Sequence, residues 1–241
     1  MIPKTIHYCW FGGNPLPENV KKMISTWKKY CPDYEIKEWN ESNFDLDTCI
    51  YAKEAYTERK WAFITDYVRL KVMYDYGGIY MDTDVEVCKN LDDLLKWDAF
   101  SGFESDKDIT TGTMGSVAGN AWIGYLLSYY NNRHFVMQDG SLDLTTNVVT
   151  ITRMTCEKYD IVLNNRMQVF GKNMCLYPFD YLCAKSYKDG SIHRTKNTYT
   201  IHHFSGSWLP RRTKIKNKIK ALMKALIGEK AFMYIRSFIK K

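Results

Sequence analysis

The chain has 241 residues, of which 45% are hydrophobic and 25% are charged, and this composition excludes a chain that is disordered throughout. The formal net charge of +7 is unevenly divided, because residues 211–241 carry +10 and the first 210 residues carry −3. A nucleic-acid binder would need a positive field from the body of the fold, so that class is disfavoured. The charge instead indicates a nearly neutral body with a basic tail.

Strands and helices alternate along the body of the chain. A helix is predicted over 18–30, between Pro17 and Pro32, and another over 58–76, where Gly77-Gly78 provides the C-cap. Strands are expected at 5–11, 34–39, 79–85 and 199–204, and further strand-like or helical stretches at 99–103, 121–130 and 147–158. This alternation predicts an α/β fold with a mainly parallel central sheet flanked by helices.

Two aspartates in the strand expected at 79–85 are candidate metal ligands. Side chains alternate along a strand, so Tyr80, Asp82 and Asp84 are expected on one face. Neighbouring carboxylates repel each other unless a cation lies between them, and Mg²⁺ or Mn²⁺ prefers oxygen ligands. The alternative is a solvated turn at the end of a strand.

The helix that precedes this strand carries a second pair of charged residues. Asp66 and Arg69 are three residues apart and therefore share a helix face. A planar guanidinium beside a carboxylate suits vicinal sugar hydroxyls or a diphosphate. The alternative is a surface ion pair that contributes less than about 1 kcal/mol.

The pattern Asp-x-x-Arg followed by Gly-Gly-x-Tyr-x-Asp-x-Asp resembles the Asp-x-Asp sugar-binding region of glycosyltransferase family 32. It is also similar to the glucosyltransferase domains of the large clostridial toxins. The blocks at 6–13 and 202–208 support the resemblance in the same order, from about residue 2 to residue 209. The resemblance implies a GT-A fold over 1–209. The segment 210–241 lies outside the resemblance, and its own charge and spacing predict a basic amphipathic helical tail.

The resemblance also implies a role for individual residues. Trp10 would stack on the base of a nucleotide sugar, which is expected to be a UDP-sugar. Asp84 would bind Mn²⁺ or Mg²⁺ directly, and Asp82 would touch the ribose and reach the metal through water. Other positions that the resemblance assigns to the donor are Asp66, Arg69, Tyr80, Ser207 and Trp208.

Two adjacent histidines leave the remaining metal ligand open. Alternation along a strand points His202 and His203 to opposite faces, so only one is expected to bind the metal. The position of Trp208 favours His203, whereas other related patterns favour His202.

The implied reaction is the transfer of a hexose, with retention, to a lipid-linked or polysaccharide acceptor, such as a bacterial capsular polysaccharide. No residue is identified as a nucleophile, and a front-face substitution needs none; Asn147 is a candidate neighbour of the donor sugar. The alternative is a non-catalytic scaffold subunit of a membrane glycan-synthesis complex.

The tail and the cysteines bear on location. Ile215, Ile219, Leu222 and Leu226 follow a helical spacing among lysines, which is typical of a helix on an anionic membrane surface or of one packed on the domain. The seven cysteines include no C-x-x-C pair and are expected to be reduced and mostly buried. Without a signal peptide or an apolar span, the expected location is cytoplasmic, at the inner face of the plasma membrane.

Overall fold

The computed structural model describes residues 1–206 and Gly228. The unit formed by residues 1–204 contains every helix and strand described below. The predicted tail at 210–241, with the exception of Gly228, and the positions Ser207 and Trp208 lie outside the described residues, so their roles remain predictions. Among the described residues, no helix has the length and apolar character that crossing a membrane requires.

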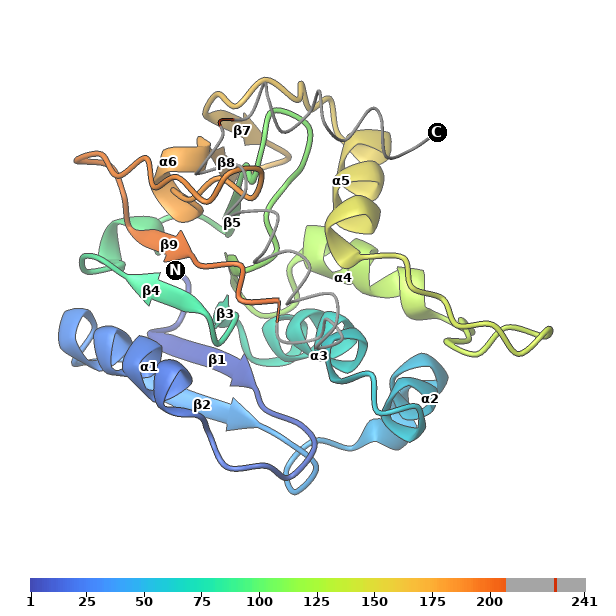
Figure 1. Ribbon diagram of the computed structural model, residues 1–241. Coiled ribbons are helices and arrows are strands. Elements are labelled where there is room, and N and C mark those ends of the chain that lie inside the picture. Colours follow the sequence, from blue (N-terminus) through green and yellow to red (C-terminus); the bar gives the residue numbers. More distant parts are fainter. Residues whose placement is uncertain (207–227, 229–241) are drawn as a thin grey trace. The chain divides into compact units, whose positions relative to one another are not determined.

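A seven-stranded sheet in the order β2-β1-β3-β6-β5-β8-β7 lies at the centre of this unit (Figure 1). Five of its strands run in one direction, whereas β6 and β7 run antiparallel to their neighbours, which confirms the prediction of a mainly parallel sheet. The strands are β1 (Thr5–Cys9), β2 (Glu35–Trp39), β3 (Gly78–Met81), β5 (Ala99–Gly102), β6 (Thr113–Ser116), β7 (Gln168–Phe170) and β8 (Met174–Tyr177).

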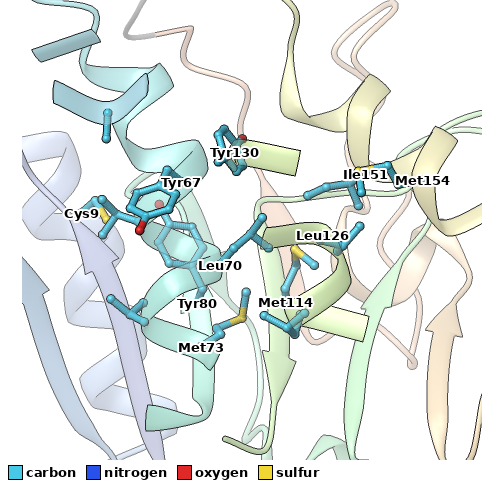
Figure 2. Close-up of a cluster of buried hydrophobic side chains, with 14 of the residues drawn as sticks. Cys9, Tyr67, Leu70, Met73, Tyr80, Met114, Leu126, Tyr130, Ile151 and Met154 are labelled. Atoms are coloured by element: carbon cyan, nitrogen blue, oxygen red, sulfur yellow. The ribbon is translucent and has the colours of Figure 1, made fainter. Parts of the chain in front are cut away.

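Helices cover both faces of the sheet. Side chains of α1 pack with Ile6, Tyr8 and Ile79 on one face, and α2 to α5 contribute to a larger cluster on the other. Figure 2 shows this larger cluster, in which Leu70 and Met73 meet Met114 and Leu126. The helices are α1 (Glu18–Tyr30), α2 (Ile50–Thr57), α3 (Trp61–Tyr76), α4 (Ala121–Leu127), α5 (Asn147–Lys158) and α6 (Phe179–Leu182).

The seven cysteines all lie in this unit as free thiols, and six of them are buried. Only Cys156, on α5, is partly exposed. The prediction of mostly buried cysteines is therefore confirmed.

The strand predicted over 79–85 is divided into two elements, which corrects the expectation that Asp82 and Asp84 share one strand face. The chain leaves the sheet after Met81, and the amide of Val85 donates to the carbonyl of Asp82 at 3.0 Å in a turn. The next strand, β4 (Val85–Val87), pairs with β9 (Thr200–His202) in a separate two-stranded sheet. β3 is buried on both faces, where ionised carboxylates would lose hydration, so the acidic pair lies beyond its end.

The end of α3 brings the chain sharply into β3 through two glycines. Gly78 has φ = +102°, and a Cβ atom there would lie 2.8 Å from the carbonyl oxygen of Thr5. Both the backbone conformation and the space therefore require glycine.

We expect Gly78→Ala to lower the free energy of unfolding by about 2–4 kcal/mol, because left-handed strain adds to the clash with a strand backbone. Gly140→Ala is the matched control, since Gly140 has φ = +80° with no atom within 4 Å of an added Cβ. Urea unfolding measures both variants. Equal losses in the two would contradict the close approach at Gly78.

Candidate active site

One edge of the sheet collects the predicted site residues. β1 lies between β2 and β3 and is parallel to both, so the three carboxyl ends meet at that edge (Figure 1). Trp10 follows β1, Asn40 follows β2 and Asp82 follows β3. Carboxyl ends of parallel strands are where open α/β sheets bind ligands.

A cavity of about 870 Å³ opens beyond the ends of β1 and β2. Trp10 lines it, and its ring nitrogen donates to the carbonyl of Asn14 at 2.6 Å. Trp61, the first residue of α3, lies against Gly12, where a Cβ atom would be 2.8 Å from the indole. The remaining lining residues are Gly13, Glu38, Asn40, Glu41, Ser42, Tyr56 and Arg59. Two partly exposed indoles in one cavity suit a flat aromatic ring.

Arg69 links the helix α3 to the acidic turn after β3. Its Nη2 lies 3.1 Å from Asp66 Oδ1 and 3.2 Å from Asp82 Oδ1. Its Nη1 donates to the carbonyl of Thr111 at 2.6 Å, and the guanidinium lies 4.6 Å from the ring centre of Tyr80. The side chain is only 4% exposed, so the alternative of a solvated surface pair is wrong. Each contact holds the fork of donors in one orientation.

Burial and mutual charge determine the ionisation of Asp66 and Arg69. Loss of hydration raises the pKa of Asp66 to about 7, although the positive charge of Arg69 acts in the opposite direction. Burial also opposes the charge of Arg69, but the carboxylates of Asp82 and Asp66 outweigh it and hold the Arg69 pKa above its ordinary value. A permanent cation therefore stands between two carboxyl groups.

Asp82, Asp84 and His202 form a cluster, with ligand atoms all within 4.8 Å of one another. His202 Nε2 lies 3.1 Å from Asp84 Oδ1 and 3.9 Å from Asp82 Oδ2. The β4–β9 pairing produces this proximity, because it sets His202 opposite Val85. The structure thus brings together two acids that it does not place on one strand.

His203 is not part of that cluster. His203 directly follows β9, and its Nε2 lies 2.8 Å from the carboxylate of Glu86. The geometry therefore favours His202 over the His203 that the position of Trp208 suggested.

The cluster fits a divalent cation. Asp82 Oδ1 accepts hydrogen bonds from Tyr80 at 3.1 Å and faces Arg69, which leaves Oδ2 directed toward His202. Burial lowers the pKa of His202, but the charge of Asp84 outweighs this effect and raises the pKa well above its ordinary value. A positive charge is favoured between these carboxylates, and their two oxygens and one imidazole nitrogen are donors that Mn²⁺ accepts.

Sequence reasoning missed Glu104 and Cys183. Glu104 follows β5, a strand that runs in the same direction as β3, and Cys183 is the C-cap residue of α6. The ligand atoms of both residues lie within 4.8 Å of a ligand atom of His202. Burial, assisted by Asp108, raises the pKa of Glu104 to about 7, and His202 acts in the opposite direction. The sequence does place Glu104 two residues after a strand at this edge, a position similar to that of Asp82 after β3.

The raised pKa of Glu104 predicts a pH dependence of stability. In the folded state Glu104 retains its proton up to about pH 7, whereas in the unfolded state it loses the proton near the ordinary glutamate pKa. The free energy of unfolding therefore falls as the pH rises from the ordinary glutamate pKa to about 7. We expect Glu104→Gln to gain stability relative to wild type between pH 5 and pH 8. Urea unfolding with a chelator present measures this difference, and a constant difference would contradict the buried acid.

Part of this sheet edge lies in a segment that matches a known protein family. Residues 17–101 match the family described as "Glycosyltransferase sugar-binding region containing DXD motif". This segment of the chain is therefore similar to that glycosyltransferase family. The matched segment includes α3, β3 and the Asp82–Asp84 turn, and it confirms the resemblance inferred from the sequence.

Two curated relatives support the match. Inositol phosphoceramide mannosyltransferase 3 of Schizosaccharomyces pombe is 31% identical over 51% of this chain and 35% of its own length. Uncharacterized glycosyltransferase L373 of Acanthamoeba polyphaga mimivirus is 25% identical over 62% of each chain. The chain thus spans less than two thirds of either relative.

A solved structure, "PaToxG Glycosyltransferase", superimposes with a TM-score of 0.50 and 19% identity, covering 65% of this chain and 70% of that one. At this identity the likeness concerns the fold alone, and it confirms the predicted GT-A class.

Asn147 also lies close to the candidate site. As the first residue of α5 it accepts a hydrogen bond from the hydroxyl of Thr111 at 3.1 Å, and the carbonyl of Thr111 in turn binds Arg69. Its amide nitrogen is buried without a hydrogen-bond partner among the described residues. A buried donor without a partner costs free energy, so this amide is available to an oxygen of a ligand.

Proposed function

We propose that the protein is a divalent-metal-dependent, retaining hexosyltransferase that uses a nucleotide diphosphate sugar. One observation carries this proposal: Asp82 presents one carboxylate oxygen to Arg69 and Tyr80 and the other to His202, at the sheet edge that also holds the indole-lined cavity. A single residue thereby joins a candidate sugar-binding group to a candidate metal-binding group.

Each part of the edge suits one part of the donor. The base would lie in the cavity against Trp10, and the hexose hydroxyls would bind Asp66 and Arg69. Asp84 and His202 would hold Mn²⁺ or Mg²⁺ with Asp82. A cation held there supplies positive charge against the diphosphate as it leaves.

The proposed reaction needs no nucleophile from the protein. The acceptor hydroxyl oxygen forms a bond to the anomeric carbon on the face from which the bond to the diphosphate breaks, and its proton passes to the departing diphosphate. The buried Arg69 keeps the sugar in position during this exchange, and orientation of this kind accounts for a large part of enzymatic rate enhancement.

The acceptor is proposed to be a glycan carried by a lipid or a polysaccharide, such as a capsular polysaccharide. The fission-yeast relative is an inositol phosphoceramide mannosyltransferase, which supports a lipid-borne acceptor. The proposed location is the cytosolic face of a membrane, where the +10 charge of residues 211–241 would favour anionic lipid. Sedimentation with anionic vesicles tests this location, and unchanged binding after removal of residues 211–241 would contradict it.

A donor panel tests the proposed function. The full chain is incubated with nucleoside diphosphate sugars that differ in base and in hexose, with Mn²⁺, with Mg²⁺ or with a chelator. We expect slow hydrolysis of one donor class that requires the metal. Hydrolysis of none, together with an absence of metal-coupled binding of nucleoside diphosphates, would contradict the proposal and favour the scaffold alternative.

A further inference from the structure

A second group of metal-binding side chains lies on the other side of His202. Glu104 follows β5, Cys183 ends α6 and His202 lies in β9, yet their ligand atoms all lie within 4.8 Å of one another. Cys183 is fully buried, while Glu104 and His202 are partly exposed, so the cluster has an open side. Three separate elements therefore converge on one point.

The donor set differs chemically from the first cluster. Asp82 and Asp84 offer hard oxygen atoms, which suit Mg²⁺ and Mn²⁺, whereas Cys183 offers sulfur. A set of one thiolate, one imidazole and one carboxylate, with a fourth position open, is a donor set that Zn²⁺ accepts. The two clusters therefore select different cations.

An unpaired atom of His202 supports a ligand at this point. Nε2 faces Asp84, while Nδ1 is buried and has no partner of good hydrogen-bond geometry among the described residues, although the Cys183 thiol interacts with the ring and contributes to its raised pKa. Glycine at position 112 permits the ring to lie where it does, because a Cβ atom there would be 2.9 Å from Nδ1. Buried polar atoms are ordinarily satisfied, so an unpaired one calls for a partner.

We propose that Glu104, Cys183 and His202 form a second cation site, selective for zinc and chemically similar ions, that shares His202 with the Asp82–Asp84 cluster. On binding, the Cys183 thiol releases its proton to solvent, as do Glu104 and Nδ1 of His202 where they carry one. The freed sulfur, oxygen and nitrogen atoms then form bonds to the ion. Because His202 belongs to both clusters, zinc in this site competes with the proposed catalytic metal for that ligand. Zinc binding does not rest on the proposed function, whereas inhibition by zinc does.

Cadmium absorption tests the binding. When Cd²⁺ is added to the metal-free full chain of the wild type, the ultraviolet absorption of a thiolate-to-metal bond is expected to rise until one equivalent of Cd²⁺ is bound. Cys183→Ser should abolish that absorption, and Glu104→Gln should weaken Cd²⁺ binding at least about tenfold. Cys156→Ser, which removes the partly exposed cysteine on α5, should behave as wild type.

Absorption that survives in Cys183→Ser, or its absence in wild type, would overturn the site. Circular dichroism verifies that each variant is folded. If Cys183→Ser fails to fold, the tenfold weakening in Glu104→Gln decides the question, and unchanged binding there overturns the proposal.

Zinc inhibition tests the shared ligand. Hydrolysis of the donor at fixed Mn²⁺ is titrated with Zn²⁺, and each variant is compared with its own zinc-free rate. We expect the half-inhibitory zinc concentration to rise at least about tenfold in Glu104→Gln and to stay at the wild-type value in Cys156→Ser. Inhibition of equal strength in all three would show that zinc acts at the Asp82–Asp84 cluster and would overturn the competition. If no donor is hydrolysed, the proposed function is contradicted. The cadmium titration still tests the second cation site independently.

Discussion

Asp84→Asn is expected to reduce metal-dependent donor hydrolysis by about 10²–10³-fold. The substitution removes a charged oxygen 3.1 Å from His202 and leaves a weaker ligand for a divalent cation. The loss should fall mainly on the rate at saturating donor, because the charge that the cation balances grows as the diphosphate leaves. Steady-state hydrolysis at several Mn²⁺ concentrations measures this effect.

Glu86→Gln provides the matched control. Glu86 lies two residues further along the same segment and pairs with His203 on the opposite side of the strand. Its replacement should change the rate by less than about threefold, since Glu86 is not a member of the Asp82–Asp84–His202 cluster and does not line the cavity. Similar losses in the two variants would indicate a general disturbance of β4 and would contradict a metal site at Asp84.

Arg69→Met is expected to lower the free energy of unfolding by about 3–5 kcal/mol. The substitution leaves Asp66 and Asp82 at a buried site without the cation that separates them, and it removes the hydrogen bond to Thr111. Methionine conserves much of the apolar volume, so the loss reports mainly on charge. Urea unfolding in the absence of metal measures it.

The control for this prediction is Arg153→Met. Arg153 pairs with Glu157 on the exposed face of α5, where each side chain is about half exposed. Exposed pairs contribute about 0–1 kcal/mol, so this variant should differ little from wild type. An equal effect of the two substitutions would mean that the buried cluster does not depend on Arg69.

Elements with clear boundary residues could be predicted from the sequence. The bounds of α1 coincide with the prediction because Pro17 and Pro32 limit the helix on both sides. The end of α3 coincides because Gly77 adopts φ = +67° directly after it. α2, β6, β7 and β8 were not predicted; β6, for example, has the sequence Thr-Met-Gly-Ser, which carries no alternation.

The site could be predicted only where its residues are close in the sequence. Asp66 and Arg69 share a helix face, so their pairing followed from spacing. The turn after Met81 could not be predicted from the sequence, because a continuous strand and a strand followed by a turn have the same local pattern. The choice between His202 and His203 depended on the pairing of β4 with β9, which are more than 100 residues apart. Long-range pairing of this kind leaves no local signal.

Glu104 and Cys183 illustrate the same limit. Cys183 has no neighbour in the sequence that indicates a site, and Glu104 has only the strand before it. Each reaches His202 because β5, α6 and β9 converge. Their significance is therefore a property of the fold.

The central claim is that one edge of the sheet binds a nucleoside diphosphate together with a divalent cation. Calorimetric titration of the full chain with UDP and with other nucleoside diphosphates, each with and without Mn²⁺, tests this claim most directly. For one of these nucleotides we expect at least about tenfold tighter binding with Mn²⁺ in wild type, and no such gain in Asp84→Asn. Nucleotide binding that is absent, or that is equally strong without the metal, would contradict the account.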